Sequence, residues 1–321
     1  MALRHPAWRQ FEAWSIQADD ATEAALLGLG LGRAHLSALP PILRRSALPD
    51  LVDVHDAIRL NLPGDEVIGK LKEAERFVAA MAIPFAVAVL NDLLAVALEM
   101  FQSAGAAVAI GDPFELVLQR LRDALTAHCA VAVSDNASRL LSFLQRLRND
   151  IVHSGGRTTQ KQIGRWNELN ADQQARWEAA AKRLATLTVG RMTHLGAGEV
   201  RATWSVTRGY AREVNDVMTT ALPRSVWARI AAEDFKLVRP TKLNDPTRVV
   251  VHAVRYARSW YAELDLTEDT IASGLEASPW AFSAFGYAAT HSRLLTRLGR
   301  PPPVPRRVTW RHQEERHAAK R

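Results

Sequence analysis

The chain has 321 residues, of which 48% are hydrophobic, and this composition supplies enough apolar surface for a large core. Cys129 is the only cysteine, which excludes a disulfide within the chain and a zinc site built from cysteines, and it fits a reducing, cytoplasmic location. The formal net charge is +7, but residues 300–321 alone contribute +5, with seven basic and two acidic side chains. The charge therefore indicates a basic tail rather than a basic face built for nucleic acid.

Residues 1–64 are predicted to form an N-terminal helical extension without a signal peptide. Trp8, Phe11 and Trp14 are spaced three apart, as on one face of a short helix. The glycine-rich run at 28–32 has no strand before it and no Lys-Ser or Lys-Thr after it, so it does not predict a phosphate-binding loop. We expect these glycines to connect two helices.

A regular amphipathic pattern begins at Asp65 and continues to about residue 190. Short connections join its helices, which predicts an up-and-down bundle. Pro84 separates the first two helices, and Ser134 and Asp135 offer caps for the fourth. The predicted helices span 66–82, 85–103, 113–131, 137–153 and about 171–188.

The most apolar run, at 78–98, has the length of a membrane span but not its composition. Pro84, Asn91 and Asp92 interrupt it, whereas a spanning helix needs about 20 nearly uncharged apolar residues. We therefore expect two buried helices, or one kinked helix, and no membrane.

The region 191–298 is predicted to be helical as well, and residues 299–321 to form a disordered, proline-rich basic tail. Apolar residues recur at helical spacing, and no run alternates apolar and polar residues strictly enough to demand a sheet. The chain is therefore predicted to be all-α. The helices expected in this region span 198–221, 224–237 and 247–264, with one or two more within 268–297.

The stretch that begins at Arg148 is the only one with specific chemistry. It closes helix 137–153, which carries a core-facing leucine stripe, and Gly155 suits the left-handed position that ends a helix. An ideal helix advances about 100° per residue, so Asn149 and His153 share a face while Arg148 and His153 point about 140° apart. Arg148 and His153 can act together only if the helix loosens near Asp150 or if a second chain supplies one of them.

These residue types suit the cleavage of RNA. Histidine exchanges a proton near neutral pH, arginine holds a phosphate with a charged, forked donor, and Asn149 can orient His153 or bind a phosphate oxygen. RNA carries its own nucleophile, the 2′-hydroxyl, so a base and a cation suffice for transesterification without a metal.

A purely structural interpretation of Arg148 and His153 stays open beside the chemical one. A histidine in the last turn of a helix is favourable, and an arginine beside an apolar stripe is routine. The same spacing recurs at Arg307 and His312 in the tail. The weight of the motif therefore comes from its context, with a bundle helix before it and two glycines after it.

The run 148–153, Arg-Asn-Asp-Ile-Val-His, resembles the Arg-polar-x-x-x-His motif of HEPN domains, the higher eukaryotes and prokaryotes nucleotide-binding domains. Together with the helical pattern of about 66–190, the resemblance implies a HEPN-type bundle in a metal-independent endoribonuclease, acting as a toxin or an anti-phage defence effector. It implies that Arg148 binds the scissile phosphate, that His153 is the general base or acid, and that Asn149 fills the polar position.

The resemblance also implies partners. RNA is the expected substrate, the expected assembly is a homodimer whose motifs meet at the interface, and an antitoxin or inhibitor protein is a further possible partner. No cofactor is expected, and no metal, because the histidines form no His-x3-His pair and the one Glu-x-x-His spacing, Glu314 to His317, lies in the tail. Some members of the family have lost activity, so the alternative is a non-catalytic module that binds a partner protein or nucleic acid.

Overall fold

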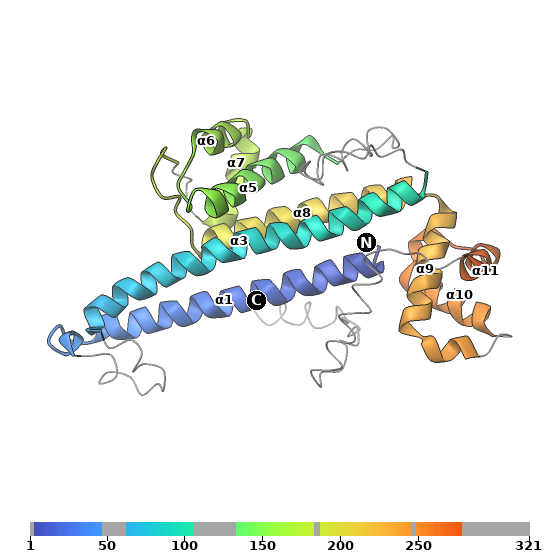
Figure 1. Cartoon of the computed structure of the whole chain (residues 1–321), viewed down its shortest axis with the longest axis horizontal. Coiled ribbons are helices and arrows are strands. Elements are labelled where there is room, and N and C mark those ends of the chain that lie inside the picture. The colour runs from blue at the N-terminus through green and yellow to red at the C-terminus, as the bar shows by residue number, and fades with distance from the viewer. Residues whose placement is uncertain (1–2, 47–61, 106–132, 183–186, 245–247, 278–321) are drawn as a thin grey trace, which may run out of the picture. The chain divides into compact units, whose positions relative to one another are not determined.

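The computed structural model describes residues 3–46, 62–105, 133–182, 187–244 and 248–277 (Figure 1). Every regular element in these ranges is a helix, which confirms the prediction of an all-α chain for the part of the chain described. Residues 1–278 form one compact unit, and the predicted boundaries near 65 and 190 lie inside it. Three predicted features lie outside the described residues: helix 113–131, residues 278–298 and the tail 299–321.

Three long helices lie at the centre of this unit: α1 (Pro6–Ala38), α3 (Gly64–Ser103) and α8 (Ala197–Ala221). α1 and α3 lie side by side, and α8 packs along α3 (Figure 1). The core lies between them, where side chains such as Ile83, Leu90 and Trp204 are fully buried. Burial of these apolar faces is the main force that holds the long helices together.

α1 runs without a break through the glycine run that we expected to connect two helices, so that prediction was wrong. Trp8 and Phe11 are buried near its start, as their spacing indicated. Gly32 faces α3, because a Cβ at this position would meet the side chain of Leu71 at 3.5 Å. Packing along α3 outweighs the roughly 1 kcal/mol that each glycine costs a helix.

α3 is also a single helix, so the predicted separation into helices 66–82 and 85–103 was wrong, and of the two alternatives the single helix through Pro84 is the one observed. Proline in a helix interior removes a hydrogen bond and costs about 3 kcal/mol. Ile83 and Ala86, on either side of Pro84, are fully buried, so core packing keeps the helix continuous there. By length and composition alone α3 could cross a membrane. However, 61% of its most apolar 18-residue segment is buried inside the unit, and a core helix has the same length, composition and burial.

Three shorter helices come next among the described elements: α5 (Asp135–His153), α6 (Gln160–Asn167) and α7 (Ala171–Ala181). α5 contacts α3 and α8, α6 packs on α5, and α7 packs on α8. The Ser134 hydroxyl caps α5 as predicted, by accepting from the amide of Ala137 at 3.2 Å. The backbone turns left-handed at Lys182 (φ 57°), so α7 ends before the predicted residue 188. α6 was not predicted.

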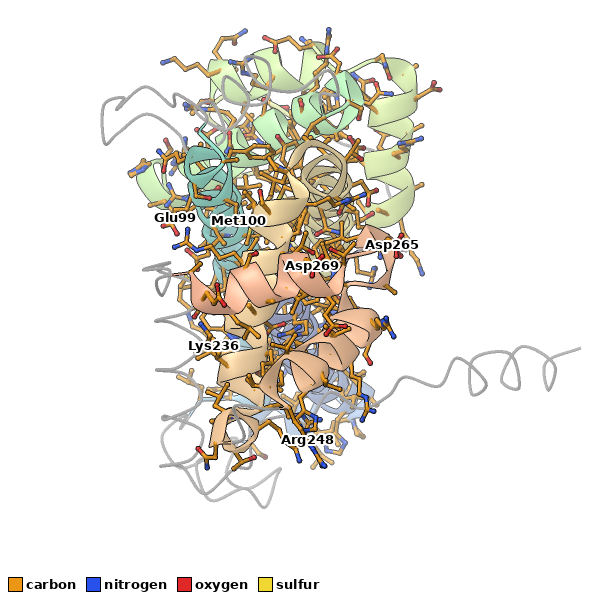
Figure 2. The ribbon with its side chains drawn as sticks, turned by 90° about the vertical axis from the view of Figure 1, so that its right-hand side faces the viewer. Glu99, Met100, Lys236, Arg248, Asp265 and Asp269 are labelled. Carbon is orange, nitrogen blue, oxygen red and sulfur yellow. The ribbon has the colours of Figure 1, made fainter. Side chains whose placement is uncertain are left out.

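The other helices predicted after residue 190 are α9 (Arg224–Val238), α10 (Val249–Trp260) and α11 (Glu268–Glu276). These three contact one another. Figure 2 looks onto α11, which carries Asp269 and lies across α9. Gly274 permits this close crossing, because a Cβ there would lie 2.7 Å from the carbonyl oxygen of Ala228 in α9. Short 3-10 turns complete the described elements: η1 (Leu43–Arg45), η3 (Pro240–Asn244) and η4 (Ala262–Leu264).

A buried ion pair fastens the start of α1 to the C-terminal helices. The carboxylate of Asp234 in α9 accepts from Nη1 and Nη2 of Arg9, at 3.0 and 2.5 Å, and from the hydroxyls of Tyr256 and Tyr261, at 2.9 and 2.8 Å. Arg9 also lies over the ring of Trp260, 5.0 Å from its centroid. Burial, and then the charge of Asp234, raise the pKa of both tyrosines above the usual range, so both hydroxyls stay protonated and keep donating.

His5, next to this ion pair, is a fully buried neutral histidine. Burial, and then the charge of Arg9, lower its pKa to about 3. In the orientation that satisfies its neighbours, the side-chain amide of Asn215 donates to Nε2 of His5 at 3.1 Å. The folded state therefore holds the imidazole in its uncharged form.

We expect His5 to make the free energy of unfolding fall as the pH drops below about 6.5. The unfolded chain binds a proton near pH 6.5 and the folded chain only near pH 3, so His5 removes up to about 1.4 kcal/mol per pH unit between those values. Urea unfolding of the wild type and of His5→Gln across this range measures the effect. The wild type should lose stability relative to the variant as the pH falls, and a pH-independent difference would contradict the buried neutral state.

Candidate functional site

The candidate site lies at the C-terminal end of α5. Leu140, Leu144 and Leu147 of this helix are buried, as the leucine stripe predicted. The backbone is left-handed at Gly155 and Gly156, with φ of 58° and 77°, which confirms that the two glycines end the helix and turn the chain away from it.

Asp150 holds this helix end in place, and sequence reasoning assigned it no role. Its side chain is fully buried; Oδ1 pairs with Nη2 of Arg146 at 2.5 Å, and Oδ2 accepts from the hydroxyl of Thr159 at 2.8 Å. Its backbone carbonyl accepts from the amides of Ser154 at 2.9 Å and Gly156 at 3.0 Å. In the sequence, the i,i+4 spacing of Arg146 and Asp150 is the pattern that could have predicted the ion pair between them.

Thr159 extends this cluster to the next helix. Its hydroxyl oxygen accepts from the amide of Gln162 at 3.2 Å and so caps α6, while it also accepts from Nη2 of Arg146 at 3.1 Å. The end of α5 and the start of α6 are therefore joined by one set of hydrogen bonds around a buried carboxylate. A site at this helix end stands on a rigid support.

The segment after the glycines pairs with the segment before α8. The amide of Thr158 donates to the carbonyl of Arg191 at 2.8 Å, and the amides of Gly190 and Thr193 donate back to Thr158 and Gly156, each at 2.9 Å. We call residues 156–158 and 190–193 the loop pair. A buried hydrogen bond at 2.9 Å also joins the Thr158 and Thr193 hydroxyls.

The structure brings two of the three predicted site residues into contact. Nη1 of Arg148 donates to Oδ1 of Asn149 at 2.9 Å, and both side chains are half-buried. His153 is exposed and makes no hydrogen bond or ion pair with any described residue. It lies one helical turn after Asn149, on the same face. Asn149 therefore contacts Arg148 and shares a helix face with His153.

α5 remains a regular helix as far as His153, so the expected alternative of a loosened helix near Asp150 was wrong. The helix stays regular there because an ion pair and a hydrogen bond hold the buried Asp150 side chain, and two further hydrogen bonds hold its backbone carbonyl. The backbone directions of Arg148 and His153 diverge as calculated for an ideal helix. The long side chain of Arg148 partly compensates, because its guanidinium turns toward Asn149.

The charges around this helix end favour an anion. Arg157 and Arg191 of the loop pair are exposed, whereas the carboxylate of Asp150 is buried and already paired. Three apolar side chains are also exposed: Val152 of α5 at 49%, Met192 of the loop pair at 45%, and Val189, just before the loop pair, at 52%. In the described ranges no group of three or more His, Cys, Asp or Glu side chains could hold a metal ion. The surface thus combines an accessible imidazole, cations and apolar contacts.

No family model, curated protein or solved structure matches the chain.

Proposed function

We propose that this chain is a metal-independent endoribonuclease of HEPN type, with its site at the C-terminal end of α5, and that it acts in the cytoplasm as a toxin or an anti-phage defence effector. The observation that carries the proposal is the exposed His153 one turn after the hydrogen-bonded pair Arg148 and Asn149. The exposed cations Arg157 and Arg191 support it, because an RNA backbone is recognised first by its charge.

In the proposed reaction, His153 removes the proton of a ribose 2′-hydroxyl. The 2′-oxygen then attacks the adjacent phosphorus, the bond to the 5′-oxygen breaks, and the leaving oxygen takes a proton. Arg148 neutralises the charge that develops on the phosphate. The products are a 2′,3′-cyclic phosphate and a 5′-hydroxyl end, and no metal or cofactor takes part.

Purified protein incubated with single-stranded RNA in excess EDTA tests this function. We expect the RNA to be cut and each upstream fragment to carry a 2′,3′-cyclic phosphate, which mass spectrometry identifies. RNA that stays intact at every protein concentration would oppose the proposal.

A homodimer fits the geometry, because the backbone directions of Arg148 and His153 diverge on a regular helix. The exposed side chains of Val152, Val189 and Met192 offer apolar contact area for a second chain, or for an inhibitor protein that covers the site.

Mixing two inactive variants tests whether the site is shared between chains. If Arg148 of one chain acts with His153 of another, a heterodimer of Arg148→Ala and His153→Ala chains holds one intact site and one site that lacks both residues. In an equimolar mixture with random pairing, half of the dimers are heterodimers, and each has one of its two sites intact. We therefore expect the mixture to regain about a quarter of the wild-type cleavage rate, although each variant alone is inactive. Inactivity of a mixture that native mass spectrometry shows to contain the heterodimer would contradict a shared site.

A second candidate is a non-catalytic helical module that binds a partner protein or nucleic acid. The contact between Arg148 and Asn149 favours it, because it gives the arginine a structural partner in the absence of any phosphate. This candidate predicts that labelled RNA or a partner protein is bound while the RNA remains intact.

A further inference from the structure

An apolar stripe on α3 faces away from the core. Phe77, Met81 and Phe85 are 67%, 58% and 47% exposed, whereas Ile83 and Leu90 of the same helix are fully buried. Side chains at spacing i, i+4 and i+8 lie on one face of a helix, so the three exposed ones form a single patch. Contiguous exposed apolar side chains, unlike single ones, mark a surface that another molecule covers.

The face that carries this patch is symmetric about Met81. Counted in either direction from Met81, the residues on this face lie 4, 7 and 11 positions away, all within about 40° of it around the helix. Equivalent positions carry phenylalanine at 4, alanine at 7 and opposite charges at 11. The pairs are Phe77 and Phe85, Ala74 and Ala88, and Lys70 and Asp92, all exposed except the half-buried Ala74. A helix face with this pattern is complementary to a second copy of itself that runs in the opposite direction.

A two-fold axis at Met81 pairs every residue of the face with its equivalent on the second copy. Phe77 of one chain then meets Phe85 of the other, and Met81 meets its own copy between these rings. Methionine packs favourably beside aromatic rings and adapts its shape to them. The alanines at the next layer leave room for the two helices to approach to the usual 8–10 Å between axes.

The charges at the two ends of the face favour this antiparallel pairing. Asp92 makes no hydrogen bond or ion pair with a described residue, and partial burial raises the pKa of its carboxyl, as expected for a carboxylate without a nearby cation. Lys70 pairs only with Glu73 of its own helix, with Nζ 3.0 Å from Oε2, and an exposed pair of this kind contributes little. A parallel pair in register would instead place like charges opposite each other.

We propose that a second copy of this chain docks on this face of α3, antiparallel to the first, with the two-fold axis at Met81. A membrane surface fits the face less well, because Glu73 and Asp92 lie beside the patch and anionic lipid repels carboxylates. This docking does not depend on RNA cleavage, since the face shares no residue with the end of α5. If the end of α5 also binds a second copy, two different two-fold contacts build an assembly larger than a dimer.

Cysteine cross-linking of the full chain tests the register, in a Cys129→Ser background that removes the only native cysteine. Met81→Cys should form a disulfide-linked dimer under mild oxidation, because the two copies of this residue meet at the axis. Lys70→Cys and Asp92→Cys should each fail to link alone, since their two copies lie roughly 33 Å apart along the helices, but a mixture of the two variants should link. Lys72→Cys, exposed on the opposite side of α3, is the matched control and should not link.

Analytical ultracentrifugation measures the association itself. Met81→Glu should halve the mass of the wild-type assembly, because two carboxylates would face each other across the axis. Met81 is exposed, so circular dichroism should show an unchanged fold. Phe85→Glu is a second variant of the same kind, and its association should be lost in the same way.

A charge exchange then separates docking from a general effect on α3. Asp92→Lys should weaken the association at least about 10-fold, because it sets two cations opposite each other. Adding Lys70→Asp to the same chain should restore the association, since opposite charges then meet again. A purely structural role of either residue gives no such rescue.

These measurements use no RNA, so a failure of cleavage and a failure of association are read separately. Three results overturn the proposed docking: cross-linking of Lys72→Cys as efficient as that of Met81→Cys, self-linking of Lys70→Cys, or an unchanged mass in folded Met81→Glu and Phe85→Glu. A wild type that stays monomeric at its highest soluble concentration also overturns it. So does a monomer that binds vesicles of phosphatidylcholine and phosphatidylserine through this face, which would assign the face to a membrane.

Discussion

Replacing His153 with alanine is expected to reduce RNA cleavage by about 10²–10⁴-fold while leaving the fold intact. The proposed reaction loses its proton acceptor. The folded state loses little, because His153 is exposed and has no described partner, and its favourable position at the helix end contributes at most about 1 kcal/mol. Initial rates on a labelled RNA, with circular dichroism of the same samples, measure both effects.

His35→Ala is the matched control for this substitution. His35 is also an exposed histidine in the last turn of a long helix, α1, so any general effect of removing a charge at a helix end is the same in both variants. We expect His35→Ala to cleave RNA at the wild-type rate. If His153→Ala also retains that rate, His153 is not the base, and the assignment of the site is lost.

Replacing Asp234 with alanine is expected to destabilise the protein by about 3–5 kcal/mol. The carboxylate accepts from Arg9, Tyr256 and Tyr261, and it is only 1% exposed. Its removal leaves a largely buried guanidinium without a counter-charge and two buried hydroxyls without their acceptor. Chemical denaturation with guanidinium, monitored by circular dichroism, measures the loss.

Two variants show whether the loss comes from the ion pair. Asp216→Ala removes an exposed aspartate of α8 and should change the stability by no more than about 0.5 kcal/mol. The double variant Arg9→Met, Asp234→Leu should be more stable than Asp234→Ala alone, because it removes both charges together. If Asp234→Ala loses no more stability than Asp216→Ala, the ion pair of Arg9 and Asp234 does not fasten α1 to α9 and α10.

Patterns within a short window of sequence, such as a cap or an apolar stripe, correctly predicted several of the helices. The leucine stripe and the Ser134 cap predicted α5 almost to its ends, and the spacing of apolar residues predicted α8 and α9. The same kind of signal misled at the glycine run of α1 and at Pro84 of α3. There, burial against other helices outweighs the cost of the helix-breaking residue, and that burial is not visible in a short window of sequence.

The candidate site, too, was predicted only in part from such short-range patterns. The position of Arg148, Asn149 and His153 at a helix end followed from the helix pattern and the glycines. The role of Asp150 did not, because its partner Thr159 belongs to the next helix. The ion pair of Arg9 with Asp234 was beyond any local pattern, since its residues are 225 positions apart in the chain.

The role of the 2′-hydroxyl is the most direct test of the central claim that this chain cleaves RNA without a metal. Wild-type protein is incubated in EDTA with an RNA oligonucleotide and with the same oligonucleotide carrying 2′-deoxyribose on the 5′ side of each cleaved bond. We predict that the RNA is cut to 2′,3′-cyclic phosphate ends and that the substituted positions resist cleavage. Equal cleavage of both substrates, or cleavage only after Mg²⁺ is restored, would contradict the proposed function.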